Sequence, residues 1–235
     1  MAVGYERIIF EGASIEEMNS ALLAETACYK QLGRFSDAAG ALSRIRLFVL
    51  TPEERAEVLY QKELCLFLAG DFEQAASLIS EVQDSQDALL LHSLVLAYAG
   101  RYDESEIFAA RCISWDGESP YLQELLQLYR EQPAPRSPVT AMALSFFPPA
   151  GHLYNDSIGD AALSGVFNAA ALAFTVANLC GGYWVTGILG GGIALNATFM
   201  GNQQRNAYLV DKNNRNDALA FGDRLRAFYT EHSIL

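Results

Sequence analysis

Residues 161–200 decide the fold, and they read AALSGVFNAAALAFTVANL-CGG-YWVTGILGGGIALNATFM. They lie in a run of 44 residues, 161–204, that carries no formal charge. Cys180-Gly181-Gly182 divides the stretch into two apolar segments, Ala161–Leu179 and Tyr183–Met200, of 19 and 18 residues. A helix of that length spans roughly 27–28 Å, close to the bilayer hydrocarbon thickness of about 30 Å. The stretch therefore predicts a hairpin of two transmembrane helices.

Small residues recur within this hairpin at helical spacing. Gly187 and Gly191 form a GxxxG pair, and Gly165 and Ala169 begin a second series of small residues four positions apart. Such faces let two helices approach closely in a bilayer. We predict that the hairpin packs through these four positions. The alternative is that residues 161–200 form a buried helical pair of a soluble fold.

Charge is distributed unevenly along the chain. Residues 1–132 hold 22 acidic and 10 basic side chains, net −12, whereas residues 133–235 hold six of each. Nucleic-acid binding depends on lysine and arginine, so this balance argues against a nucleic-acid partner. We expect the acidic half to bind a protein, and residues 161–200 to contact a membrane through apolar side chains.

The pattern Gly-x-aromatic-x-x-small occurs three times in the first half of the chain. Its members are Gly33, Phe35 and Ala38; Gly70, Phe72 and Ala75; and Gly100, Tyr102 and Ser105. The intervals of 37 and 30 residues bracket the 34 of a tetratricopeptide repeat. A glycine can adopt positive φ where a helix ends, and the small residue lets the next helix approach closely. We predict three helical hairpins.

Residues 14–115 resemble the tetratricopeptide-repeat family on these turns. The small residue that the family carries in the first helix of each repeat falls here at Thr26, Glu63 and Ser93. The resemblance implies an all-α solenoid that binds a protein. The alternative is an unrelated array of helical hairpins with glycine turns, which has the same architecture.

Local signals divide the chain into three parts. Ser14 and Glu17 form a capping-box pattern, as do Thr51 and Glu54, which flank a proline at the first helical position. Three prolines between Gln132 and Pro138 indicate a stiff, extended connector. We predict a repeat domain over residues 1–131 that folds on its own, a linker over 132–140, and over 141–235 the hairpin with a polar C-terminal helix. An asparagine-rich interruption is expected in that helix at residues 213–216.

The segment before the hairpin carries the spacing Ser-x-x-Pro-x-x-Gly-x-x-Tyr. Its members are Ser145, Pro148, Gly151 and Tyr154. This spacing, followed by two apolar segments, resembles the entry to the two-helix hairpin of TM2-like bacterial membrane proteins. The sequence departs from that family at Pro149, His152 and Asp156, where the family has Gly, Gln and Gly. The resemblance implies a bacterial cell-envelope protein with a bent entry to its hairpin.

The sequence offers no constellation for catalysis. His92, His152 and His232 are far apart and belong to no metal or nucleophile motif. The four cysteines form no CxxC, which favours free thiols and leaves disulfide pairing open. We therefore expect no enzyme activity, no cofactor and no metal.

These features together predict an all-α, membrane-anchored scaffold for protein–protein interaction. An accessory subunit of a membrane-assembly or transport complex, and a soluble protein that forms homo-oligomers through its apolar hairpin, are the alternatives. Arg136 before the hairpin and Arg205 after it predict that both ends lie on one side of the membrane. The positive-inside rule places that side in the cytoplasm. Removal of a leader would make it periplasmic, which the envelope resemblance slightly favours.

Overall fold

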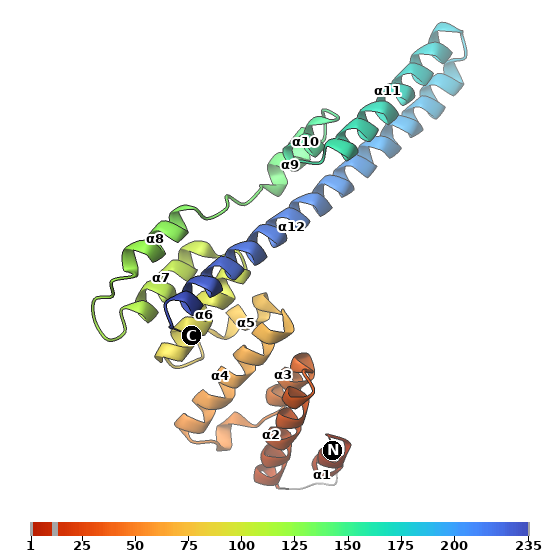
Figure 1. The fold of residues 1–235 in the computed structure, drawn as a ribbon. Helices are drawn as coiled ribbons and strands as arrows, with labels where there is room; N and C mark the ends of the chain where they lie inside the picture. The colour runs from red at the N-terminus through yellow and green to blue at the C-terminus, as the bar shows by residue number, and fades with distance from the viewer. Residues whose placement is uncertain (1, 11–13, 235) are drawn as a thin grey trace. The chain divides into compact units, whose positions relative to one another are not determined.

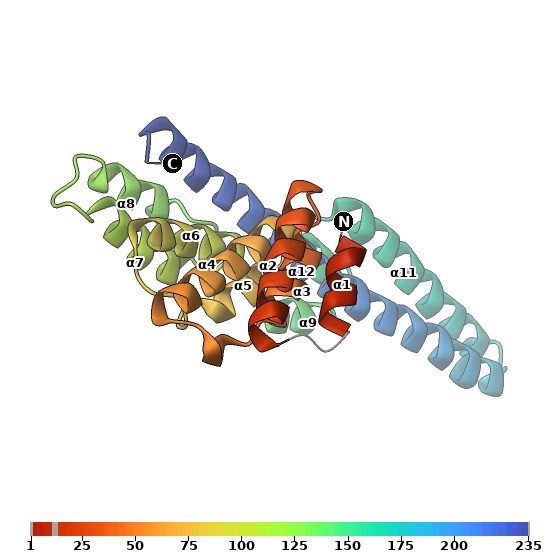
Figure 2. The same ribbon diagram turned by 90° about the horizontal axis from the view of Figure 1, so that it is seen from below.

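In the computed structural model, which describes residues 2–10 and 14–234, every regular element is helical. Figure 1 shows the order of these helices along the chain, and Figure 2 shows them from a second direction. The all-α prediction is confirmed for the part of the chain that the structure describes.

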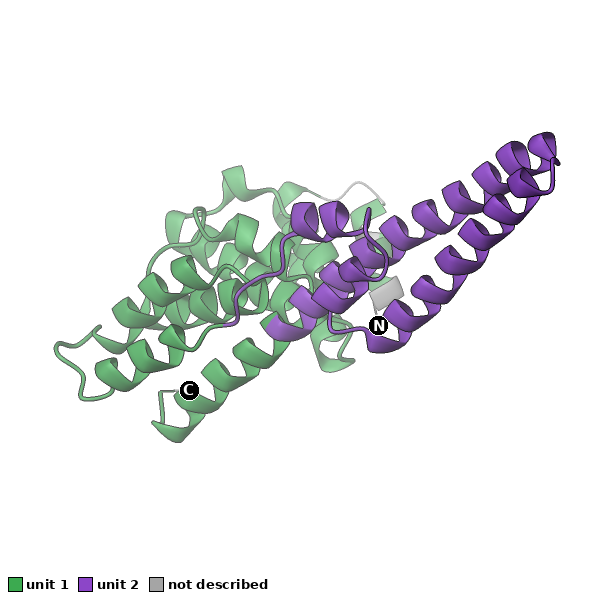
Figure 3. Ribbon diagram, turned by 90° about the horizontal axis from the view of Figure 1, so that it is seen from above, with its two compact units in different colours: residues 1–132, 218–235 green, residues 133–217 purple. Residues whose placement is uncertain are grey.

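The chain forms two compact units, coloured in Figure 3. Unit 1 comprises residues 1–132 and 218–235, and unit 2 comprises residues 133–217. Unit 1 contains α1 (Ala2–Phe10), α2 (Ile15–Gln31), α3 (Phe35–Ser43), the 3-10 turn η1 (Leu47–Val49), α4 (Pro52–Ala69), α5 (Phe72–Leu78), α6 (Gln86–Tyr98), α7 (Tyr102–Ile113) and α8 (Leu122–Arg130). Unit 2 contains α9 (Pro138–Leu144), α10 (Ala150–Tyr154), α11 (Ile158–Cys180) and the π-helical turn η2 (Thr186–Gly190). The last helix, α12 (Gly191–Glu231), contributes residues to both units.

The three predicted turns of unit 1 have the same local geometry. Gly33, Gly70 and Gly100 all have positive φ, of 68°, 82° and 75°. The aromatic residue two positions later begins the next helix each time, at Phe35 in α3, Phe72 in α5 and Tyr102 in α7. The small residues Ala38, Ala75 and Ser105 are fully buried. In each turn the backbone N–H after the glycine donates to a carbonyl five residues earlier, at 2.8–2.9 Å, which satisfies the helix end.

The last turns of α12 complete the core of unit 1. Phe221, Leu225 and Tyr229 are at most 1% exposed, and they pack with residues of α6, α7 and α8. The Tyr229 hydroxyl lies 2.7 Å from Ser93 Oγ, within hydrogen-bond distance. The sequence grouped these residues with the hairpin in 141–235. Their apolar face instead covers the third helical pair, because residues at spacings of three and four line one side of a helix.

A buried contact between a carboxyl group and an imidazole joins α4 to α6. Glu63 and His92 are both fully buried, and Glu63 Oε2 lies 3.1 Å from His92 Nε2. Burial raises the pKa of the Glu63 carboxyl, and the contact with His92 opposes this only in part. Glu63 occupies a position where the tetratricopeptide pattern has a small residue, so His92 serves here as its polar partner within the core.

We expect the stability of unit 1 to depend on the ionisation of Glu63. Because its folded-state pKa lies above the ordinary value of 4.5, the folded chain holds the proton more tightly. The free energy of unfolding should therefore fall as pH rises from 4.5 through the folded-state pKa of Glu63. Glu63→Gln should lack this loss, which thermal unfolding at a series of pH values would measure. The exposed Glu118→Gln serves as control, and parallel pH profiles for all three chains would contradict the prediction.

Candidate functional site

The apolar part of unit 2 is an antiparallel hairpin of α11 against η2 and the first half of α12 (Figures 1 and 2). At its open end Arg205 Nη2 lies 2.9 Å from Asp160 Oδ2. Further along, the Thr198 hydroxyl donates to Asn168 Oδ1 at 3.0 Å. These two pairs mark the register of the hairpin, because each joins a residue of α11 to one of α12 across the contact.

Most apolar side chains of the hairpin are exposed. α11, of 23 residues, has an 18-residue window with mean hydropathy 1.6, of which only 11% is buried. Leu163, Phe167 and Leu172 are each 55–56% exposed. α11 is thus not a buried core helix of this chain, and its length and composition suffice to cross a membrane.

The second predicted transmembrane helix is not confirmed. Among the described residues α11 alone is long and apolar enough to cross a membrane. The segment 183–200 contains the π-helical turn η2, and α12 begins only at Gly191. α12 then continues beyond Met200 into charged sequence. Tyr183 and Trp184, at the hairpin turn, are 68% and 63% exposed.

Only one of the two predicted small-residue faces lies within the hairpin contact. A Cβ added at Gly191 would lie 2.2 Å from Thr175 Oγ1, and one at Gly187 would lie 2.9 Å from Leu179 Cδ2. Gly165, by contrast, has open space at the Cβ position, and Ala169 is exposed. The prediction that the hairpin also packs through Gly165 and Ala169 is therefore wrong, since this face of α11 points away from α12.

Gly191→Leu should separate the two helices of the hairpin. The added side chain overlaps Thr175, whose Cβ would lie 2.8 Å from the new Cβ. The free energy of unfolding should fall by about 1–3 kcal/mol. The variant should show a lower thermal midpoint in detergent, and a disulfide between cysteines placed at positions 168 and 198 should form more slowly. Gly192→Leu is the matched control, because a Cβ there meets nothing within 4 Å. Equal behaviour of the two variants would refute close packing at Gly191.

The base of the hairpin holds a buried polar cluster built from the Ser145–Tyr154 segment and α12. Asn206 Nδ2 donates to Ser145 Oγ at 2.7 Å, and Asn155 Nδ2 donates to the Gly151 carbonyl at 2.9 Å. Ser145, Asn155 and Asn206 are at most 3% exposed. A Cβ at Gly151 would lie 2.3 Å from Asn206 Nδ2. The predicted entry residues Ser145 and Gly151 thus meet at one point, where glycine leaves room for the amide.

Gly151→Ala should disrupt this cluster. The new methyl occupies the place of the Asn206 amide, which would lose its hydrogen bond to Ser145 while still buried. A buried amide left without a partner costs about 1–3 kcal/mol, so the unfolding midpoint of unit 2 should fall. Gly159→Ala adds the same methyl where nothing lies within 4 Å, and should leave the midpoint unchanged. Equal stability of the Gly151→Ala and Gly159→Ala chains would disprove the close approach.

The other two entry residues lie at the edges of the cluster. Pro148 precedes α10, and the Pro148–Pro149 peptide bond is cis. The Tyr154 hydroxyl accepts a hydrogen bond from the Ser137 N–H at 2.9 Å, which ties α10 to the start of α9. Asp156 has a positive φ of 55°. This is the position where the TM2-like pattern carries glycine, and aspartate is among the few other residues that adopt this conformation readily.

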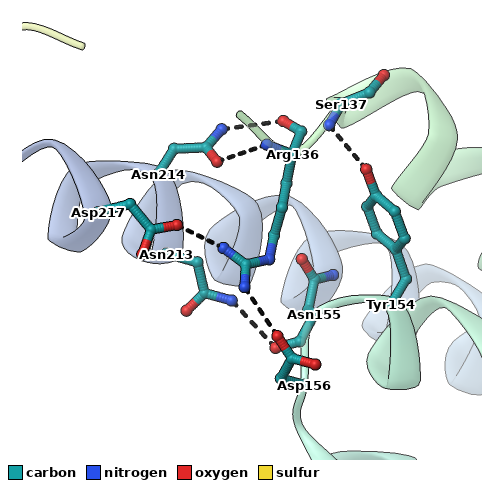
Figure 4. A network of polar contacts seen from close by, with 8 residues as sticks. All are labelled: Arg136, Ser137, Tyr154, Asn155, Asp156, Asn213, Asn214 and Asp217. Atoms are coloured by element: carbon teal, nitrogen blue, oxygen red, sulfur yellow. Dashed lines mark hydrogen bonds and ion pairs between the residues drawn. The ribbon is translucent and has the colours of Figure 1, made fainter. Parts of the chain in front are cut away.

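A second polar network fixes the connector of unit 2 to α12 (Figure 4). Arg136 forms ion pairs with Asp217 at 2.7 Å and Asp156 at 2.8 Å. Its backbone N–H and carbonyl both bond to the Asn214 amide, at 2.8 and 2.9 Å. Asn213 Nδ2 donates to the Asn155 carbonyl at 3.0 Å. The predicted interruption at residues 213–216 is wrong, because α12 is continuous there. The Asn214 side chain binds the connector, and the Asn213 side chain binds the chain just after α10.

Sequence reasoning missed the asparagines of α12 as members of the site. Their spacing carried a signal, because Asn202, Asn206 and Asn213 fall on the same helix face as the buried Leu209 and Val210. The described residues contain no group of three histidine, cysteine or carboxylate side chains placed to hold a metal ion. All four cysteines are free thiols. The polar contacts described above are hydrogen bonds of amides and hydroxyls together with the ion pairs of Arg136 and Arg205.

Comparison with known proteins adds no assignment. No protein-family model matches the chain, and neither the curated proteins nor the solved structures contain a match.

Proposed function

We propose that this protein is a membrane-anchored scaffold of the bacterial cell envelope, in which the helical repeats bind a protein and the apolar hairpin inserts into the bilayer. The observation that carries the proposal is the exposure of the hairpin. It has no charge between Asp160 and Arg205, and its large apolar side chains are uncovered. Exposed apolar surface of this extent is typical of a membrane or protein contact.

The distribution of polar groups along the hairpin supports the membrane as the contact. The charged pair Asp160–Arg205 stands at its open end, and Tyr183 and Trp184 stand at its turn. Charged groups and aromatic residues at the two ends of an apolar span suit the two bilayer interfaces. Asn168 and Thr198, between these ends, bond to each other and to helix backbone carbonyls, as the interior of a bilayer requires.

The repeat unit supports the interaction half of the proposal. Its three equal turns favour tetratricopeptide-like repeats, a fold built for binding proteins. A groove of about 690 Å³ lies between α5 and α7, where Arg101 pairs with Glu104 and Arg111 pairs with Asp84. These two ion pairs balance the charge of the groove itself. Over residues 1–132 as a whole acidic side chains are in excess, so a basic protein surface is the complementary partner.

Membrane fractionation tests the anchor. The full chain should float with membranes in a density gradient and stay with them through a carbonate wash, because insertion does not depend on surface charge. A chain recovered from the wash as a monodisperse soluble oligomer would favour the alternative in which the hairpin joins copies of the protein.

Salt dependence tests the binding by the repeats. Binding of a basic partner should weaken as the salt concentration rises. Binding that does not change with salt would contradict electrostatic steering.

A further inference from the structure

We propose that two copies of this protein pair in the bilayer through the side of α12 that carries Asn196. Asn196 lies in the charge-free run, nine residues before Arg205 and thirteen after Tyr183. With the hairpin inserted in a bilayer, its amide lies within the hydrocarbon, roughly 13–14 Å from the level of Arg205. The inference rests on the proposed membrane function and names a second copy of the chain as a partner of the hairpin.

Asn196 differs from the other two asparagines of the apolar segments in its hydrogen bonding. The Nδ2 groups of Asn168 and Asn178 each donate to the carbonyl four residues earlier, at 2.8 Å. The Asn196 side chain is exposed and bonds to none of the residues that the structure describes. Within a helix the backbone N–H groups are already used, so the Oδ1 of Asn196 needs a donor from elsewhere. Hydrocarbon supplies no such donor, which makes the unpaired amide unfavourable there.

The Asn196 side of α12 points away from α11. Gly191 and Thr198 mark the side of α12 that contacts α11. Successive residues of a helix are rotated by about 100°, so Asn196 is turned by roughly 140–160° from both of them. A donor for its amide must therefore come from outside the hairpin.

Asn196 stands in a row of exposed apolar side chains. Leu189, Ile193, Asn196 and Met200 follow one another at intervals of four, three and four residues. The three apolar members are 61%, 70% and 47% exposed, in chain order. This spacing is that of the seam between two helices that pack at about 20° to each other. A single asparagine in such a seam fixes the register and the number of helices.

A second copy of the chain is the partner that fits this amide. A carboxamide both donates and accepts hydrogen bonds, so two Asn196 side chains satisfy each other. All copies insert with the same orientation, which places Asn196 at the same depth in each of them. A two-fold axis along the bilayer normal then brings the two amides and the two apolar rows together. A different membrane protein would need an amide of its own at that depth.

Sedimentation equilibrium of the full chain in density-matched detergent tests the pairing. We expect a dimer whose Kd rises about tenfold in Asn196→Leu, because hydrogen bonds between transmembrane helices are lost. Asn196→Gln keeps an amide and should retain most of the affinity. Asn178→Leu is the matched control, since that amide already donates to the Phe174 carbonyl, and its Kd should not change. Equal Kd values for Asn196→Leu and Asn178→Leu, or a monomer at every concentration, would overturn the proposal.

Cross-linking in phosphatidylcholine vesicles separates the pairing from the membrane anchor. Each chain would carry one new cysteine, with the exposed Cys180 replaced by serine. On oxidation Ile193→Cys should join its counterpart across the two-fold axis. Leu172→Cys should not, although it lies at about the same level of α11, twelve residues from Asp160 as Ile193 is from Arg205. A chain that resists carbonate but cross-links equally at both positions, or at neither, keeps the anchor and refutes the pairing. Release by carbonate would refute the anchor, and with it pairing in the bilayer.

Discussion

Residues 1–132 expressed without the C-terminal helix should be far less stable than unit 1 in the full chain. Removal of residues 218–235 takes away Phe221, Leu225 and Tyr229, and exposes the aromatic surface beneath them. Full burial of each such side chain contributes about 1.5–3 kcal/mol, so removing all three should lower the free energy of unfolding by roughly 5–9 kcal/mol. The whole free energy of unfolding of a domain is only about 5–15 kcal/mol. The fragment should therefore unfold at a much lower urea concentration than the full chain, as measured by circular dichroism.

Adding the missing helix as a separate peptide tests whether the loss is specific. A synthetic peptide of residues 218–235 should raise the urea midpoint of the 1–132 fragment in a concentration-dependent way. A scrambled peptide of equal composition should not. Equal midpoints for the fragment with and without the authentic peptide would show that residues 1–131 fold on their own, as the sequence alone predicts.

Leu172→Arg should strongly impair membrane insertion. Leu172 lies near the middle of α11 and is 55% exposed, so in a bilayer it would face the hydrocarbon. An arginine at the centre of a transmembrane helix costs roughly 2.5–3.5 kcal/mol on insertion scales. The fraction of the chain resistant to carbonate should fall accordingly, while the repeat unit keeps its helical circular dichroism.

The matched control places the same charge on an apolar position of unit 1. Leu32 is 68% exposed at the end of α2, and Leu32→Arg should leave membrane retention unchanged. If Leu172→Arg and Leu32→Arg chains fractionate alike, α11 does not lie in the hydrocarbon, and its apolar surface contacts another protein instead.

The local features of this protein could be predicted because neighbouring residues produce them. Ser14 with Glu17, and Thr51 with Glu54, form both bonds of a capping box, and each pair spans only three residues. The positive φ at Gly33, Gly70 and Gly100 likewise follows from helix endings read within a few positions. The apolar hairpin was evident for the same reason, since a charge-free run of 44 residues requires no knowledge of distant contacts.

Short-range sequence patterns thus account for the helices, their turns and the apolar hairpin, whereas the contacts of each surface depend on the folded arrangement. Gly191 and Gly165 are equally small, yet only Gly191 faces the neighbouring helix. Asn206 and Gly151 are 55 positions apart and meet only because the hairpin folds back on its entry segment. The physical reason is range: capping and helix propensity act over three or four residues, while packing depends on which helix faces arrive together.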